Sequence, residues 1–201
     1  EFARMQIAGD ILRPGRKGAA AVGFLVAGTH NTVLGASPLM KNQARQDELG
    51  EIVGTVTQAF LGLTVQCARC HNHPNEKWTQ TDFYSLAAYF AQVKRKGSGV
   101  SPPISGGTEW FYHGGSGSVK HPVTGETLAP KPPDGPPALL NEEADPRGLL
   151  VDWMVAPDNP FFARAMVNRV WREMMGRGIV EPIDDFRDSN PPVNPPLLNA
   201  L

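Results

Sequence analysis

The most specific chemical pattern in the sequence is formed by two cysteines and a histidine. Cys67 and Cys70 are the two cysteines of the 201-residue chain, and His71 follows the second directly. Two thiols at this spacing can each add to a vinyl group on one edge of a porphyrin, which forms two thioether bonds. The next side chain then reaches beneath the ring, where its imidazole can bind the iron. The spacing therefore predicts one covalent haem c, with His71 as the proximal ligand of the haem iron.

Two other interpretations fit the same residues. Cys67 and Cys70 could form a disulfide or a redox-active dithiol, in which His71 has no required role. With His73 as a fourth ligand, the thiolates and imidazoles could also hold a structural metal such as zinc. Such a site would take all its ligands from one short segment, whereas zinc sites usually take their second ligand pair from another part of the chain. We therefore favour the haem, with the other two interpretations left open.

Several side chains are candidates for the opposite side of the haem iron or for hydrogen bonds around it. His73 is too close to His71 to swing to the other haem face, so we expect it to bond a propionate or a backbone group. The remaining candidates for the distal ligand are His30, Met40 and His113, together with His121 and Met5. An open sixth position would favour small-molecule chemistry over electron transfer.

The sequence contains no second pattern typical of a catalytic site. Asp184-Asp185 and Glu142-Glu143 are neighbouring carboxylates in predicted loops, and we interpret both pairs as solvated or capping groups. No glycine-rich phosphate loop follows a strand, and no serine stands in a nucleophile elbow. Whether the protein is an enzyme is left undecided.

Composition excludes several classes of partner. The chain has 19 Lys and Arg against 20 Asp and Glu, a formal net charge of −1, so no basic field attracts nucleic acid. Hydrophobic residues make up 41% and charged residues 19%, which is typical of a soluble globular protein. No apolar stretch approaches the roughly 20 residues that cross a bilayer, so we expect no transmembrane segment in this chain.

Two helices are predicted around the cysteines. Apolar residues in steps of three and four predict a helix over 42–63, in which Gly54 and other glycines would let a second helix or a flat cofactor come close. A second helix is predicted over 82–93, capped by Thr79 or Thr81. The basic residues that follow are expected at its C-terminal end: Lys94, Arg95 and Lys96. Large apolar residues after the motif are expected in the core or against the haem: Trp78, Phe83 and Phe90.

Two further helices are predicted near the C-terminus. Asp145-Pro146 and Asn159-Pro160 are typical helix starts, and Gly176 should end the second of these helices. The buried side of that helix is expected to consist of its large apolar residues and one alanine: Phe161, Phe162, Ala165, Met166, Val170 and Met174.

Glycine and proline are concentrated between these helical regions. We expect a helical haem-binding domain over 1–97, a Gly/Pro-rich loop or β arm over 98–142 and a helical lobe over 143–201. Within the arm, 108–112 and 118–126 are predicted strands. The fold class is therefore mainly α, with two small helical lobes joined by a Gly/Pro-rich arm that contains a little β.

Long runs of the sequence resemble a known domain pair. GFLVAGTHNTVLG, FLGLTVQCARCHNHPNEKWTQTDFYSLAAYFAQV and FYHGGSGSVKHPVTGE resemble a planctomycete family of cytochrome-like domains of unknown function. The run DPRGLLVDWMVAPDNPFFARAMVNRVWREMMGRGIVEPIDDFRDSNPPVNPPLLNAL resembles the planctomycete-specific domain usually fused behind it. The resemblance implies a large, exported, multidomain protein, often with another cytochrome c-like domain in front. We therefore expect this chain to be a piece of a longer protein.

These observations lead to two functional hypotheses. The first is a c-type cytochrome-like protein that carries out electron transfer or haem-based redox chemistry in the periplasm or outside the cell. Its partner would be a redox protein or a neighbouring cytochrome domain. The alternative is an extracellular binding or scaffold module, with a structural metal or dithiol at Cys67 and Cys70. In that case the aromatic run 110–112 would supply a binding surface for sugars.

Overall fold

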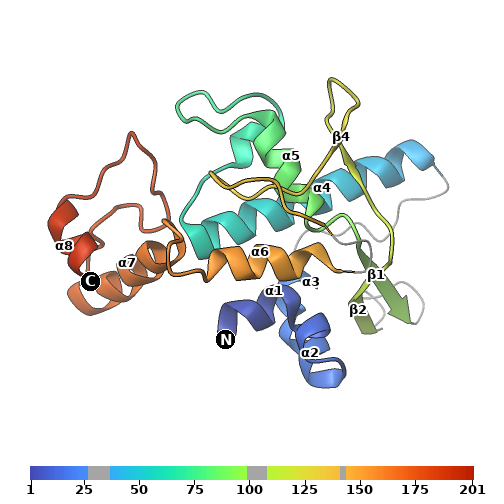
Figure 1. Cartoon of the computed structure of the whole chain (residues 1–201), viewed down its shortest axis with the longest axis horizontal. Helices are drawn as coiled ribbons and strands as arrows, with labels where there is room; N and C mark the ends of the chain where they lie inside the picture. The colour runs from blue at the N-terminus through green and yellow to red at the C-terminus, as the bar shows by residue number, and fades with distance from the viewer. Residues whose placement is uncertain (27–36, 99–107, 141–143) are drawn as a thin grey trace. The chain divides into compact units, whose positions relative to one another are not determined.

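The computed structural model describes residues 1–26, 37–98, 108–140 and 144–201, with the backbone alone for residues 26, 96–98 and 108–111. Within these residues the chain forms eight α-helices and two short antiparallel strand pairs (Figure 1). The predicted fold class, mainly α with a little β, is confirmed.

The described residues form two compact units. Unit 1 consists of residues 1–52 and 84–151, and unit 2 consists of residues 53–83 and 152–201. The chain passes from one unit to the other inside three helices: α4 (Pro38–Val56), α5 (Gln80–Ala88) and α6 (Pro146–Met154). Both units are therefore discontinuous in sequence. The boundaries predicted at 97 and 143 do not coincide with the boundaries of these units. The predicted domains therefore stay a prediction.

Unit 1 begins with three packed helices, α1 (Phe2–Leu12), α2 (Arg16–Ala21) and α3 (Gly23–Val26), coloured blue in Figure 1. Glycine lets the first two come close, since a Cβ at Gly18 would lie 2.3 Å from the carbonyl oxygen of Gly9. The apolar core of unit 1 includes buried residues from several elements: Ile7, Val22, Leu25, Leu49, Ile52, Leu86, Tyr89, Phe90, Val93 and Leu150.

The predicted strand at 108–112 is present as β2 (Thr108–His113), which pairs antiparallel with β1 (Val93–Ser98). The helix predicted over 82–93 is too long, however. α5 ends at Ala88, and the basic residues expected at its C-terminal end lie in β1.

A side chain distant in sequence explains why α5 ends early. The Arg45 guanidinium donates through Nη2 to the carbonyl oxygens of Phe90, Ala91 and Val93, at 3.1, 3.2 and 2.7 Å. A longer helix would have used these carbonyls for its own ladder of hydrogen bonds. Arg45 instead satisfies them, so the backbone is free to enter the strand.

The second predicted strand, over 118–126, is instead a small hairpin. β3 (Val119–Lys120) pairs antiparallel with β4 (Thr127–Leu128). The turn between them is stabilised by His121, whose Nδ1 accepts the backbone N–H groups of Val123 and Thr124 at 3.2 and 3.3 Å.

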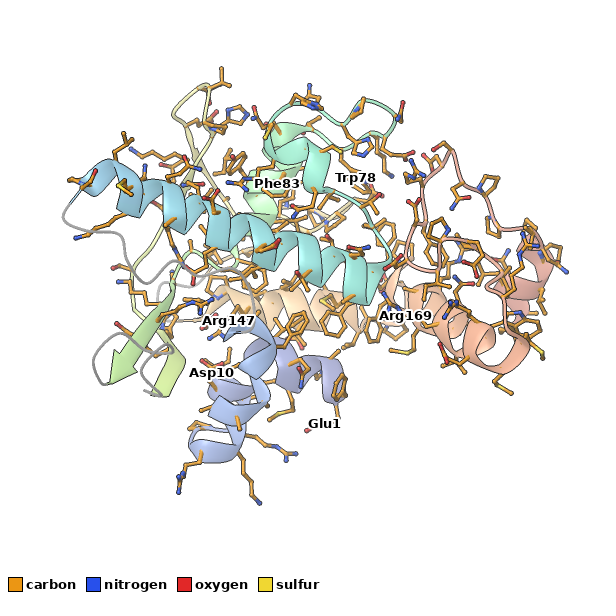
Figure 2. The ribbon with its side chains drawn as sticks, turned by 180° about the vertical axis from the view of Figure 1, so that it is seen from behind. Glu1, Asp10, Trp78, Phe83, Arg147 and Arg169 are labelled. Carbon is orange, nitrogen blue, oxygen red and sulfur yellow. The ribbon has the colours of Figure 1, made fainter. Side chains whose placement is uncertain are left out.

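α6 begins where the sequence predicts, because Asp145 caps it. The carboxylate of Asp145 accepts the backbone N–H of Arg147 at 3.0 Å. The Arg147 side chain is fully buried and also contacts Asp10 of α1, which Figure 2 labels beside it. Burial alone would lower the pKa of Arg147, but the hydrogen bonds and charges of Asp145 and Asp10 more than offset this effect and raise that pKa.

In unit 2, α7 (Phe162–Met175) ends where the sequence predicts but begins two residues after Pro160. Asn159 Oδ1 accepts the N–H groups of Phe161 and Phe162, at 3.0 and 2.9 Å, and Gly176 ends the helix with a φ of +76°.

The buried face predicted for α7 is largely wrong. Met166, Val170 and Met174 are 44%, 50% and 73% exposed, while Ala165 and the polar Asn168 are buried. Asn168 takes the interior position because its amide bonds the backbone of 179–183. A small apolar cluster, which includes residues of the C-terminal helix α8 (Pro195–Ala200), completes this part: Ile179, Val180 and Leu198, with Val167, Trp171, Phe186 and Leu197 against them.

Candidate functional site

A π-helical turn directs the chain towards the cysteines. The helix predicted over 42–63 is present as α4, followed by the π turn η1 (Thr57–Leu61) and by Gly62 in the left-handed conformation. The carbonyl oxygen of Gly62 accepts the backbone N–H of Phe186 at 2.8 Å, and a Cβ at Gly62 would lie 2.5 Å from the Phe186 ring. Glycine is therefore required here both by the positive φ and by the aromatic ring.

Cys67 lies on a short 3₁₀ turn, η2 (Gln66–Arg69), and Cys70 is the residue that directly follows it. The backbone N–H of Cys70 bonds the carbonyl oxygen of Cys67 at 3.4 Å, and Ala68 between them is buried. Residues three apart eclipse each other in 3₁₀ geometry, so the two side chains leave the turn on the same side. Both thiols are exposed and free. This arrangement presents two thiols together to a ligand outside the chain.

His71 is exposed and has a fixed tautomer. Its Nδ1 lies 2.7 Å from the backbone carbonyl oxygen of Asn72. Because a carbonyl can only accept, Nδ1 is the donor in this bond, and Nε2 of the neutral ring carries the free lone pair. A bond from one ring nitrogen to a carbonyl is the usual way in which a protein orients a metal-binding imidazole.

The loop after the cysteines is closed by hydrogen bonds at both ends. Asn72 Oδ1 accepts the N–H of Gln80 at 3.0 Å, and Gln80 Nε2 donates to the Arg69 carbonyl oxygen at 3.1 Å. Thr79 caps α5, as predicted, in reciprocal bonds with Asp82. These bonds hold the loop on the start of α5.

His73 bonds to the backbone within this loop. Its backbone N–H donates to the Trp78 carbonyl oxygen at 2.8 Å, and its ring nitrogen Nδ1 accepts the backbone N–H of Asn75 at 3.2 Å. Trp78 itself is buried in the core, as are two other aromatic residues considered as haem contacts, Phe83 and Phe90. These three rings therefore act as core residues.

A hollow of about 430 Å³ lies beside Cys67, within unit 2. This volume is within the range of small-molecule sites. Its lining includes backbone and side chains from segments far apart in sequence: Gly54, Gln66, Cys67, His73, Asp185 and Arg187. Cys70 and His71 do not line it. A Cβ at Gly54 would lie 2.4 Å from the Gln66 side chain, so this glycine makes room for the turn that carries the cysteines.

The lining of the hollow includes an ion pair that the sequence did not reveal. Arg187 Nε donates to Asp185 Oδ1 at 2.7 Å, and the Thr64 hydroxyl donates to the same oxygen at 3.3 Å. The hydrogen bond with Asp185, followed by the charges of Asp185 and Glu76, raises the pKa of Arg187. The interpretation of Asp185 as a solvated or capping group is therefore wrong, since it is buried and paired. Glu142 and Glu143 lie outside the described residues.

The candidates for the distal ligand or for hydrogen bonds around the haem are distributed over both units. His73 lines the hollow in unit 2. Met40, in the first turn of α4, and His113, at the end of β2, belong to unit 1. His113 bonds the Gln92 side chain and lies 4.0 Å from the Asp145 carboxylate. His30 lies outside the described residues, as do the side chains of two of the three aromatic residues at 110–112; the third, Tyr112, is partly exposed.

The described residues contain neither a gathered set of metal ligands nor a membrane-spanning helix. No three histidine, cysteine, aspartate or glutamate side chains in this part of the chain are gathered as a metal site requires, so the four proposed zinc ligands are not assembled. In the same residues, no helix is long and apolar enough to cross a bilayer.

Two family matches cover most of the chain. Residues 1–95, which include the cysteine turn, match the family described as PSCyt2, protein of unknown function (DUF1549). Residues 146–201 match PSD1, protein of unknown function (DUF1553). The matches are consistent with a planctomycete-type pair of domains, and both families are described as of unknown function. Comparisons with curated proteins and with solved structures gave no match.

Proposed function

We propose that the chain is a planctomycete-type, cytochrome-like protein that binds one haem c outside the cytoplasm. Cys67 and Cys70 form the two thioether bonds, and His71 binds the iron through Nε2. The main support is that the 3₁₀ turn presents both thiols on one side, while the carbonyl of Asn72 leaves Nε2 of His71 free for a metal.

The residues present fit this group. The thiols and the imidazole are exposed, so a macrocycle can reach them without a change in the core. The hollow lies beside the first of these thiols, and covalent attachment would hold a cofactor that the domain encloses only partly. The haem supplies one-electron chemistry when bound. The role of the chain is to attach the ring and to orient the His71 imidazole through Asn72.

The role in electron transfer or haem-based redox chemistry follows from this cofactor. A redox protein or a neighbouring cytochrome domain would exchange electrons with it. We propose an exported, periplasmic or extracellular protein because haem attachment by this motif takes place outside the cytoplasm.

Expression of the full chain with c-type maturation machinery tests the proposal directly. We expect a reduced-minus-oxidised spectrum with a sharp alpha band, and a pigment that acid acetone does not extract. Cys67→Ser combined with Cys70→Ser should abolish covalent pigment, while each single change should leave at most one thioether. Met174→Ala, a change on the exposed face of α7 that does not line the hollow, is the control and should keep the spectrum. A colourless protein with two titratable thiols would overturn the proposal and favour the dithiol.

A comparison of two histidines tests the role of His71. His71→Ala should lose the normal low-spin spectrum of the iron, whereas His73→Ala should leave ligation intact and change the midpoint potential only modestly. A zinc site that uses both residues would give a different result. Each change would then release metal and unfold the loop to a similar degree, because a structural site with four ligands tolerates the loss of neither. Equal damage from both changes would therefore contradict the haem.

A further inference from the structure

Most of the residues that line the hollow beside Cys67 carry hydrogen-bonding groups. Besides the Asp185–Arg187 pair, these groups are amides, a hydroxyl and an imidazole: Gln58, Thr64, Gln66, His73 and Asn75. An amide has a carbonyl acceptor and an NH₂ donor, and a neutral imidazole also has one of each. A ligand group that both donates and accepts suits such a lining better than a carboxylate, which only accepts, or an ammonium, which only donates.

Asp185 and Arg187 leave an acceptor and donors available next to each other. Arg187 Nε donates to Asp185 Oδ1, which also accepts the Thr64 hydroxyl. Among the residues that the structure describes, Oδ2 of Asp185 and the two Nη groups of Arg187 make no hydrogen bond. Asp185 is only 7% exposed, but Oδ2 is not sealed from solvent, so this oxygen is accessible from the hollow that Asp185 lines.

Gln66 brings a second set of available groups from the cysteine turn. Its side chain lies against Gly54 of α4, where a Cβ would overlap the Gln66 amide. Within the described part of the chain, this amide makes no hydrogen bond through its carbonyl or its NH₂ group. The absence of a side chain at Gly54 therefore makes room for a planar amide that remains available to a ligand.

The charges at the hollow are balanced. Its lining contains one carboxylate and one guanidinium, which are bonded to each other. The negative charge of Glu76 also acts on Arg187. The described lining therefore has no excess of positive charge for an anion, and a neutral ligand avoids the cost of taking a charge out of water. Apolar side chains complete the lining: Leu63, Val65 and Pro74.

We propose that this hollow binds a monosaccharide unit through two adjacent hydroxyls. Vicinal hydroxyls are neutral and each can donate and accept, so one donates to Asp185 Oδ2 while its neighbour accepts from Arg187. Gln66 bonds a further hydroxyl, and the apolar side chains contact the C–H face of the ring. The volume of about 430 Å³ is near the lower end of the range for small-molecule sites, which suits a single sugar unit. No haem is needed for this binding, because none of these three residues is a proposed haem ligand.

Ligand-detected NMR on the full chain, expressed with c-type maturation machinery, provides the test. The chain is titrated separately with D-glucose, D-galactose, D-mannose and L-fucose. At least one of them should bind saturably with a Kd of roughly 1 mM or tighter. Sodium succinate, a small dianion, should bind about tenfold more weakly than that sugar, because the lining offers it no excess positive charge.

Two variants test whether the sugar binds in this hollow. Arg187→Lys keeps a positive charge beside Asp185 but removes the planar fork of donors, so it should weaken binding by about tenfold. Gln66→Ala removes the available amide and should weaken binding by about threefold to tenfold. Arg172→Lys is the matched control and should leave the Kd unchanged, because Arg172 is exposed, pairs with Glu173 at 3.4 Å and does not line the hollow. Circular dichroism checks that each variant is folded.

Three outcomes would overturn the proposal. The first is no saturation by any of the four sugars at roughly 10 mM. The second is sugar binding that is unchanged in both Arg187→Lys and Gln66→Ala. The third is succinate binding more tightly than every sugar, which would contradict a neutral ligand. If Arg187→Lys does not fold, Gln66→Ala decides alone, because Gln66 is exposed and its loss leaves the core intact.

Discussion

Replacement of Arg147 by methionine is expected to destabilise unit 1 by about 3–5 kcal/mol. The fully buried guanidinium uses both terminal nitrogens on Asp10 and donates through Nε and Nη2 to Asp145. It also donates to the Ile7 carbonyl oxygen at 3.1 Å. Methionine keeps much of the apolar stem but removes the cation, so two nearly buried carboxylates would be left without their partner.

Equilibrium unfolding by urea, followed by circular dichroism, measures this effect. Arg13→Met is the matched control, because Arg13 pairs with Glu1 at 2.8 Å on the exposed surface and such pairs contribute about 0–1 kcal/mol. Combining Arg147→Met with Asp10→Asn and Asp145→Asn should recover part of the loss, since the unpaired charges are then absent. A loss below about 1 kcal/mol for Arg147→Met alone would show that the buried network is not needed for stability.

Asn168→Ala should destabilise unit 2 by about 3–5 kcal/mol, because one side chain serves several buried backbone groups. Nδ2 donates to the carbonyl oxygens of Val180 and Ile183 at 2.9 and 3.0 Å. Oδ1 accepts the N–H groups of Ile179 and Val180 at 2.7 and 3.0 Å. Each buried group left without a partner costs about 1–3 kcal/mol, with some relief where water enters.

Denaturant unfolding separates the hydrogen bonds of Asn168 from its packing. Asn168→Leu fills a similar volume without donors or acceptors, so it should destabilise at least as much as alanine. Asn199→Ala is the control, because Asn199 accepts a hydrogen bond from Arg164 on the surface. If Asn168→Leu matched the stability of the unchanged protein, packing rather than hydrogen bonding would be the function of this residue. The loss of the Asn168 hydrogen bonds should also loosen the segment 179–183, which leads to Asp185 and Arg187 at the hollow.

Local hydrogen bonds made several features predictable from the sequence. Asp145, Asn159 and Thr79 were identified as helix starts because each side chain binds backbone N–H groups two or three residues away. The cysteine pair and His71 were identified for a similar reason, since the chemistry depends on spacing within one turn. The prediction that they hold a haem is still to be tested by the spectrum of the protein.

The features that the sequence did not predict depend on residues far apart in the chain. The end of α5 depends on Arg45, which binds three carbonyls more than forty positions away. The buried face of α7 depends on Asn168, a polar residue that can lie in the interior because the backbone of 179–183 satisfies its amide.

The hollow beside Cys67 shows most clearly the difference between features that local sequence predicts and features that depend on distant residues. The sequence by itself determined the spacing of the two cysteines and His71, the start of α6, the end of α7 and the mainly α fold class. Only the tertiary structure brought Thr64 to Asp185 and placed Arg187 at the same hollow as Cys67 and His73. The physical reason is that capping and periodicity act within a turn or two of the backbone. Ion pairs and buried amides instead depend on which distant segments the folded chain brings within hydrogen-bonding distance.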